Sequence, residues 1–203
     1  MSQLSNDTNG LIGLTLSQIG LFLATGILIT TVLSVVFFND WQQTNELRSL
    51  IRNFSSLVED MDILFFENTT QFQFPGKNYH YTIQLSSEYI VVFSKSFSGS
   101  EFYMTERLYN EPWIRSSQQN WTSGITLREY LNTTYGHRGS QNDSLSLENF
   151  TDLRREQNVS SSLYALHPFE ILTGEPVYVE KVMIYYGNGQ EYDFLLLYQS
   201  TEP

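Results

Sequence analysis

Three histidines are the side chains best suited to acid–base catalysis or metal binding near neutral pH in this 203-residue sequence. They are His80, His137 and His167, and they are far apart along the chain. Pro168 directly follows the last of them and disfavours a helix at that point. The sequence has no GxSxG, Walker, GxGxxG, HExxH or EF-hand pattern. We therefore expect no enzyme activity, no cofactor and no metal site.

Two weaker candidates point to sugars or anions. Residues 134–139 read Thr-Tyr-Gly-His-Arg-Gly, which places glycines around a cationic pair. Such a loop could bind an anion or a sugar, although a plain turn is the simpler interpretation. Trp113 and Trp121 stand near Ser and Gln residues and could stack on sugar rings. Burial in the core of their own segment is the interpretation that we favour for both.

The most frequent chemical motif is the N-glycosylation sequon, Asn-x-Ser/Thr, which occurs eight times. A chain with this content of Asn, Ser and Thr would contain about three by chance. Asn6 is the only sequon residue near the N-terminus. The other seven are Asn53, Asn68, Asn120, Asn132, Asn142, Asn149 and Asn158. They predict N-glycosylation, and the alternative is a composition rich in these residues with unused sites.

The overall composition excludes several classes of protein. The chain has 11 Lys and Arg against 22 Asp and Glu, a formal net charge of −11, and no run of basic residues. We therefore expect no nucleic-acid partner, because phosphate contacts require clustered cations. The absence of Cys excludes disulfides, thiolate catalysis and iron–sulfur clusters. An aromatic content of 15% argues against a disordered chain.

The element that positions the rest of the molecule is an apolar segment at residues 11–38. Its 28 residues carry no charge, and a helix needs about 20 apolar residues to cross a bilayer. A cleaved signal peptide would have a basic region in front of a shorter apolar stretch, and no basic residue precedes Leu11. We therefore predict a short tail at 1–10 and an uncleaved transmembrane helix at 11–38, rather than a signal peptide or the core helix of a soluble domain.

One face of this helix is formed by small residues at spacings of three and four. They are Gly13, Ser17, Gly20 and Ala24. Small side chains allow two membrane helices to approach closely, so this face predicts helix–helix packing. The expected partners are membrane lipid and other membrane helices. The alternative is that Gly and Ser are simply common in membrane helices.

The side of the membrane is indicated by the sequons. Arg48 and Arg52 follow the apolar segment and alone would weakly favour a cytoplasmic domain. Seven sequons after the segment outweigh them, so we predict a single-pass protein of the cell membrane with an extracytoplasmic C-terminal domain. Asn6 would then stay unmodified. A glycosylated, acidic domain without Cys is typical of an archaeal cell surface rather than of a disulfide-rich secreted domain.

Beyond the apolar segment the pattern becomes amphipathic. Apolar residues from Leu47 to Leu64 recur at steps of three and one, which is a helical stripe. We expect residues 39–66 to continue the first helix, with the stripe packed on its own domain; a parallel coiled coil is the alternative. Asn53 lies beside the stripe residue Phe54, so we expect it to be partly shielded.

Residues 75–203 have the signals of a β-rich domain. Alternating segments at 79–85, 88–93 and 101–108 predict an antiparallel meander, and Asn188-Gly189 between 177–186 and 191–199 predicts a hairpin that closes the same sheet. We expect an irregular, glycan-bearing excursion at 109–176. It would contain a short helix at 126–131, capped by Thr126 with Glu129 in the capping box, and a weaker helix candidate at 145–153. The fold class is α+β: a long N-terminal helix followed by a mainly antiparallel sheet.

This layout, an apolar and then amphipathic helix leading into a β-rich domain, resembles the archaeal type IV pilin-like and archaellum-accessory membrane proteins. The resemblance rests on architecture over residues 11–198, not on a residue motif. It implies a membrane-anchored, surface-exposed structural or interaction protein whose partners are pilin-like subunits, including copies of itself. Such a chain would be either a filament subunit or a static anchored relative. The alternative is a surface receptor or adhesin that uses residues 109–176, and the least favoured is a membrane-tethered hydrolase.

Overall fold

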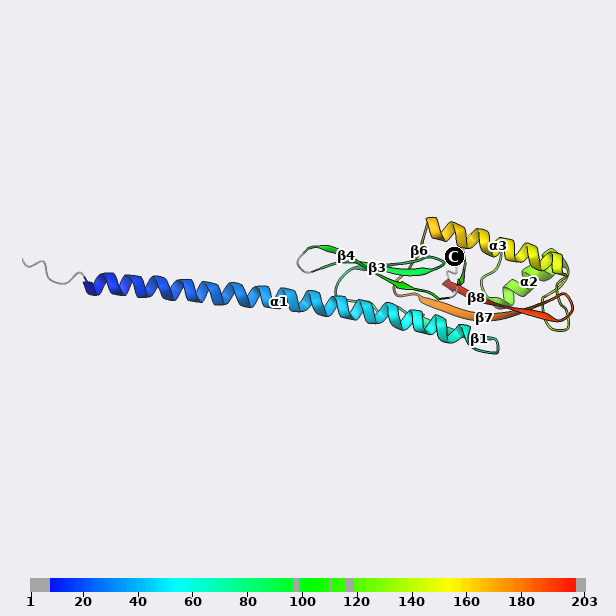
Figure 1. The fold of residues 1–203 in the computed structure, drawn as a ribbon, viewed down its shortest axis with the longest axis horizontal. Coiled ribbons are helices and arrows are strands. Elements are labelled where there is room, and N and C mark those ends of the chain that lie inside the picture. Colours follow the sequence, from blue (N-terminus) through cyan, green and yellow to red (C-terminus); the bar gives the residue numbers. More distant parts are fainter. Residues whose placement is uncertain (1–7, 97–98, 110, 116–118, 200–203) are drawn as a thin grey trace, which may run out of the picture. The chain divides into compact units, whose positions relative to one another are not determined.

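The computed structural model describes residues 8–96, 99–109, 111–115 and 119–199, and side chains from residue 15 onward. The chain divides into two compact units. One consists of residues 1–45 with 96–100, and the other of residues 46–95 with 101–203. The fold class is α+β, with one long N-terminal helix followed by a mainly antiparallel β-domain, as the sequence predicts (Figure 1).

The long helix α1 (Thr8–Asp62) belongs partly to each unit. It begins before the predicted start at residue 11, because no Pro interrupts the preceding turn. It ends at Asp62 rather than at residue 66. Lys181 binds the carbonyl of Asp62, the last residue of α1, and that of Leu64 just beyond it, and the chain then enters a strand that was not predicted from the sequence.

The apolar part of α1 is a candidate membrane span, being long and apolar enough to cross a bilayer. Its large side chains are exposed, among them Phe22 at 75% and Ile27 at 67%. The hydroxyl groups of Thr25, Thr30 and Ser34 donate hydrogen bonds to carbonyl groups four residues earlier. Their polar atoms are thereby satisfied within the helix, as a hydrocarbon environment requires.

The β-domain contains two four-stranded sheets. In the first, the strand order is β1 (Asn68–Gln73), β7 (Pro176–Tyr186), β8 (Gln190–Gln199) and β5 (Trp113–Ile114). In the second, the order is β4 (Glu101–Arg107), β3 (Tyr89–Lys95), β2 (Tyr81–Leu85) and β6 (Phe169–Ile171). All pairings between these strands are antiparallel except that of β5 with β8.

The predicted meander and hairpin are both present, as β2–β3–β4 and β7–β8. The prediction that they close one sheet is wrong. Strand β2 takes β6 as its second partner, and β7 takes β1. The hydrogen-bonding edges that would have joined the hairpin to the meander are therefore occupied by segments from elsewhere in the chain.

A first core lies between the C-terminal part of α1 and both sheets. The stripe residues Leu47, Ile51, Phe54, Val58 and Met61 are each at most 4% exposed. They share this core with strand residues from both sheets, which include Ile83, Ile90, Val179 and Leu197. The prediction that the stripe packs on its own domain is confirmed.

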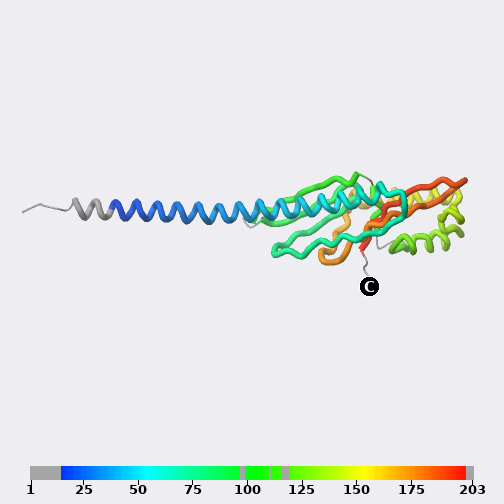
Figure 2. Tube along the Cα trace, turned by 90° about the horizontal axis from the view of Figure 1, so that it is seen from below, coloured from blue at the N-terminus to red at the C-terminus, as the bar shows by residue number. Residues whose placement is uncertain are grey.

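A second core lies where the β7–β8 hairpin, orange to red in Figure 2, meets two helices, α2 (Gly124–Tyr135) and α3 (Leu147–Leu166). Residues 109–176 are therefore not an irregular excursion. Trp113 and Trp121 are 0% and 1% exposed in this core, and their rings meet edge to face at 5.0 Å. Their predicted burial is confirmed.

Helix α3 was under-predicted because part of its buried face is polar. The buried residues Phe150, Leu153, Gln157, Ser160 and Tyr164 follow alternate steps of three and four. Gln157 and Ser160 break the apolar pattern, although the helical spacing continues to the end of α3. The weak signal at 145–153 is thus the first part of a 20-residue helix.

The start of α2 also differs from the prediction. Ser123, not Thr126, is the N-cap. The Ser123 hydroxyl accepts from the backbone N–H of Thr126, and the Thr126 hydroxyl accepts from the N–H of Ser123 at 2.8 Å. Thr126 therefore fills the reciprocal position of the capping box that the sequence analysis gave to Glu129.

Candidate functional site

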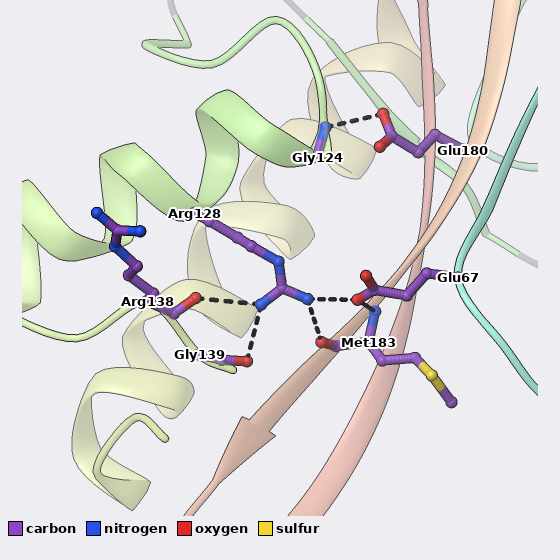
Figure 3. A network of polar contacts seen from close by, with 7 residues as sticks. All are labelled: Glu67, Gly124, Arg128, Arg138, Gly139, Glu180 and Met183. Atoms are coloured by element: carbon purple, nitrogen blue, oxygen red, sulfur yellow. Dashed lines mark hydrogen bonds and ion pairs between the residues drawn. The ribbon is translucent and has the colours of Figure 1, made fainter. Parts of the chain in front are cut away.

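A polar network fixes α2 and the chain that follows it to strand β7 (Figure 3). The Arg128 guanidinium forms an ion pair with Glu67, at the entry to β1. It also donates to the backbone carbonyls of Met183 at 2.9 Å and Gly139 at 3.1 Å. Glu67 in turn accepts from the N–H of Met183 at 2.8 Å. The planar Arg128 cation thus joins α2 to the entry to β1, to β7 and to the loop after α2, which suits its fork of donors.

Glu180 makes the second connection between β7 and α2. Its carboxylate accepts from the backbone N–H of Gly124 at 2.8 Å (Figure 3). It also accepts from the Tyr198 hydroxyl at 2.8 Å. This satisfies one of the free N–H groups at the start of α2 and places a negative charge at the positive end of the helix. Burial and this carboxylate raise the pKa of Tyr198.

Replacement of Gly124 by Ala is expected to lower the free energy of unfolding by about 1 to 3 kcal/mol, because the site has no room for a methyl group. An added Cβ would lie 2.6 Å from Cγ2 of Val182 and would also overlap the Glu180 carboxylate. The control is Gly76→Ala, where nothing lies within 4 Å and a change below about 0.5 kcal/mol is expected. Denaturant unfolding of the full chain in detergent measures both, and equal losses would contradict the steric argument.

The glycine-flanked cationic loop is held by the chain's own carboxylate. His137 Nδ1 lies 2.7 Å from Oδ1 of Asp143, and the Arg138 N–H donates to Oδ2 of Asp143 at 2.8 Å. These hydrogen bonds lower the pKa of Asp143. Gly136 and Gly139 have φ values of 76° and 66°, which L-residues rarely adopt. The plain-turn interpretation accounts for the glycines and the cationic pair.

A cavity of about 580 Å³ lies between α2, α3 and the residues just before α2. Two half-buried phenol rings, Tyr130 and Tyr135, come from α2. Three charged residues, Asp152, Arg155 and Glu156, come from α3. The volume is in the range of small-ligand sites in proteins. The sequence analysis did not identify this cavity, because its lining residues come from separate segments and share no motif.

Glu156 is the central acceptor of the cavity. The Tyr130 hydroxyl donates to its Oε1 at 2.8 Å. Burial and the Glu156 carboxylate together raise the pKa of Tyr130 to about 12, and the same two causes raise the pKa of Tyr135. The cation of the lining, Arg155, donates a hydrogen bond to the Asp152 carboxylate at 2.9 Å. The lining thus combines aromatic rings with carboxylate acceptors and one cation.

The raised pKa of Tyr130 predicts a pH dependence on the alkaline side. The protonated phenol is stabilised by folding, so this stabilisation is complete below the ordinary tyrosine pKa of about 10. It is lost as the pH rises toward about 12. In an ultraviolet absorbance titration of the folded chain, Tyr130→Phe should remove a transition near the top of the tyrosine range. Loss of a transition near pH 10 instead would contradict the hydrogen bond to Glu156.

The asparagines of the sequons are accessible in the described part of the chain. Six are exposed and Asn149 is partly buried. The exposed six are Asn53, Asn68, Asn120, Asn132, Asn142 and Asn158. The expected shielding of Asn53 is therefore wrong: its side chain is directed away from the stripe that buries Phe54. Asn6 lies outside the described residues. Glycosylation itself stays a prediction.

The small residues on α1 lie at helical spacing, as required for one face. Ser17, Gly20 and Ala24 are exposed, and a Cβ added at Gly20 would meet nothing within 4 Å. Gly13 is in the helix, in the part whose side chains are not described. In this single chain the face is open, so helix–helix packing stays a prediction.

Comparison with known proteins finds no matching family model, curated protein or solved structure.

No three of the described His, Asp and Glu side chains come together where they could hold a metal ion. His80, His137 and His167 lie outside the helices and strands, before β2, after α2 and after α3 respectively, and the partner of His137 is the Asp143 carboxylate. The cavity with Tyr130, Tyr135 and Glu156 is the candidate site, and its groups are suited to a ligand rich in hydroxyls.

Proposed function

We propose that this chain is a single-pass membrane protein whose β-domain lies outside the cell and acts as a pilin-like structural or interaction subunit. The observation that carries the proposal is the exposed apolar half of α1. Large side chains such as Leu21, Phe22 and Ile27 are more than 60% exposed, which would be costly in water and is favourable in lipid.

The extracytoplasmic placement is supported by the sequons. Seven of them follow the candidate span, and six of the seven asparagines are exposed on the folded domain. A saccharide could therefore be attached to these asparagines without unfolding the domain. The acidic surface and the lack of Cys agree with an archaeal cell surface.

The interaction role is supported by the open face on α1. Membrane helices associate by close packing, and the face of Gly13, Ser17, Gly20 and Ala24 has the spacing that allows it. The partner would be a second membrane helix, either of a pilin-like subunit or of another copy of this chain. The long helix followed by a β-domain is the layout on which the pilin-like resemblance rests.

A second candidate function is a surface receptor or adhesin. It is favoured by the cavity between α2 and α3, which lies in the segment 109–176. Its aromatic rings and carboxylates would recognise a polar ligand such as a sugar. In this case the membrane helix would serve only as an anchor.

Protease protection and glycopeptide mass spectrometry together test the leading proposal. Protease added to intact cells should remove the β-domain, and peptides that contain the seven sequons should carry glycans. Full protection of the domain, together with an intact mass that contains no glycan, would reverse the orientation. Capture of soluble sugars by the full chain in detergent, with no association of its membrane helices, would favour the receptor.

A further inference from the structure

Among the described residues that line the cavity between α2 and α3, Asn120 is the one sequon asparagine. It is the acceptor residue of a sequon, and it forms part of the cavity wall. Its side chain is exposed, whereas the next residue, Trp121, is buried in the second core. The attachment point of a glycan would thus lie on the rim of a cavity, fixed in place by a buried tryptophan.

The lining of the cavity suits a sugar ring. A pyranose has a face of C–H groups that packs on aromatic rings, and Tyr130 and Tyr135 supply such rings. Its hydroxyl groups need acceptors and donors, which Asp152, Glu156 and Arg155 supply. The side chains of Tyr130 and Glu156 are already held together by a 2.8 Å hydrogen bond, so part of the site is preorganised.

We propose that this cavity holds the first sugar of a glycan attached to Asn120. The inference rests on the proposed extracytoplasmic placement, because only there would the asparagine be modified. The sugar would pack on the two tyrosine rings and hydrogen-bond to Glu156. It would connect the chain before α2 with both helices and so stabilise this end of the domain.

An attached sugar is a better occupant than a free one because part of the lining, including Arg155, Glu156 and Val159, is exposed. A few stacking and hydrogen-bond contacts give only weak binding of a free monosaccharide. Attachment at the rim keeps the sugar beside the site at an effective concentration in the millimolar range or above. A cavity whose affinity is too low to capture a soluble sugar is then occupied by the attached sugar.

Thermal unfolding of the full glycosylated chain in detergent tests the proposal. Asn120→Gln is expected to lower the midpoint temperature by about 2 to 4 °C. The matched control is Asn142→Gln, an exposed sequon asparagine that does not line the cavity, with an expected change below about 1 °C. Enzymatic removal of all glycans should abolish the difference between the two variants, which excludes an effect of the glutamine itself.

A second set of variants asks whether the glycan acts through the cavity. In a Tyr135→Ala background, Asn120→Gln should have little further effect, because the stacking surface is gone. Glu156→Gln keeps the shape of the site and should reduce the effect by about half. If the glycan on Asn120 changes the midpoint equally in all three backgrounds, it does not lie in the cavity and the inference is wrong.

Occupancy measured by glycopeptide mass spectrometry separates this inference from the proposed function. Glycans on other sequons with Asn120 unmodified would overturn the inference and leave the surface placement intact. A protease-protected domain without any glycan would overturn both. Binding of soluble sugar by a chain that is unmodified at Asn120 would also overturn the inference, and it would favour the receptor instead.

Discussion

Replacement of Lys181 by Met should lower the free energy of unfolding by about 2 to 3 kcal/mol, because it leaves two part-buried carbonyls and a partly exposed carboxylate without their cation. The Lys181 side chain is 3% exposed. Its ammonium group donates to the Asp62 carbonyl at 2.5 Å and to the Leu64 carbonyl, and it forms an ion pair with Asp193 at 2.8 Å. Met keeps most of the apolar stem and removes only the charge and the donors.

The large effect follows from the position of Lys181 at the end of α1. The last carbonyl groups of a helix have no partner inside the helix. The last turn of α1 contains no basic residue, so the cation at its negative end comes from strand β7. In the variant the carbonyls of Asp62, the last residue of α1, and of Leu64 just beyond it would lose this donor, and the Asp193 carboxylate would lose its cation.

Denaturant unfolding followed by tryptophan fluorescence measures the effect in the full chain. Lys77→Met is the matched control: Lys77 pairs with Glu46 at 3.0 Å, but both side chains are partly exposed, so a loss below about 1 kcal/mol is expected. Asp193→Asn should lie between the two, because Asp193 is 38% exposed and the two carbonyl contacts remain. If Lys181→Met lost as little unfolding free energy as Lys77→Met, Lys181 would not cap the helix.

The elements that the sequence predicts well are those with local signals. The charge-free run at 11–38 and the stripe from Leu47 to Met61 predict α1, because apolar periodicity reports helix and buried face together. Alternating residues and turn glycines predict β2, β3, β4 and the β7–β8 hairpin. In the meander and the hairpin each strand pairs with the strand that follows it in the chain, across a short turn.

The elements that the sequence analysis missed depend on distant partners. Strand β1 pairs with β7 across more than 100 residues, and β2 takes β6, so the division into two sheets has no local signature. Helix α3 buries Gln157 and Ser160, whose hydroxyl donates to the Ile114 carbonyl at 3.3 Å. A polar residue on a buried face is stable only when its partner is present, and that partner is 46 residues away.

The same limit applies to the candidate site. The sequon at Asn120 is a local motif and was identified, but the cavity beside it was not. Tyr130 and Glu156 are 26 residues apart and meet only because α2 and α3 pack on the same hairpin. Trp121 is buried in the second core, as the sequence predicts, and lies directly after Asn120 at the rim of the cavity. The local motif and the cavity are thus brought together by the tertiary structure, which no local pattern in the sequence reports.

The strongest prediction about localisation concerns the middle of the apolar segment. Leu23→Lys combined with Ile27→Lys should displace the full chain from the membrane. Each lysine at the centre of a membrane helix costs about 2.5 to 3.5 kcal/mol, so the pair shifts the partition equilibrium by a factor on the order of 10³ to 10⁵. Both positions are more than 60% exposed in the folded chain, so the substitutions disturb no packing within it.

A lysine near the end of the segment provides the control. Gln18→Lys adds a single charge near the predicted membrane boundary, where a long side chain can reach the head groups at little cost. Alkaline extraction of membranes followed by flotation measures all the proteins. The wild-type chain and Gln18→Lys should stay with the lipid, and the double variant should be released. Release of the wild-type chain, or full retention of the double variant, would show that α1 is not a transmembrane anchor. Because every contact of the β-domain is unchanged in these variants, such an outcome would count against the membrane assignment and not against the fold.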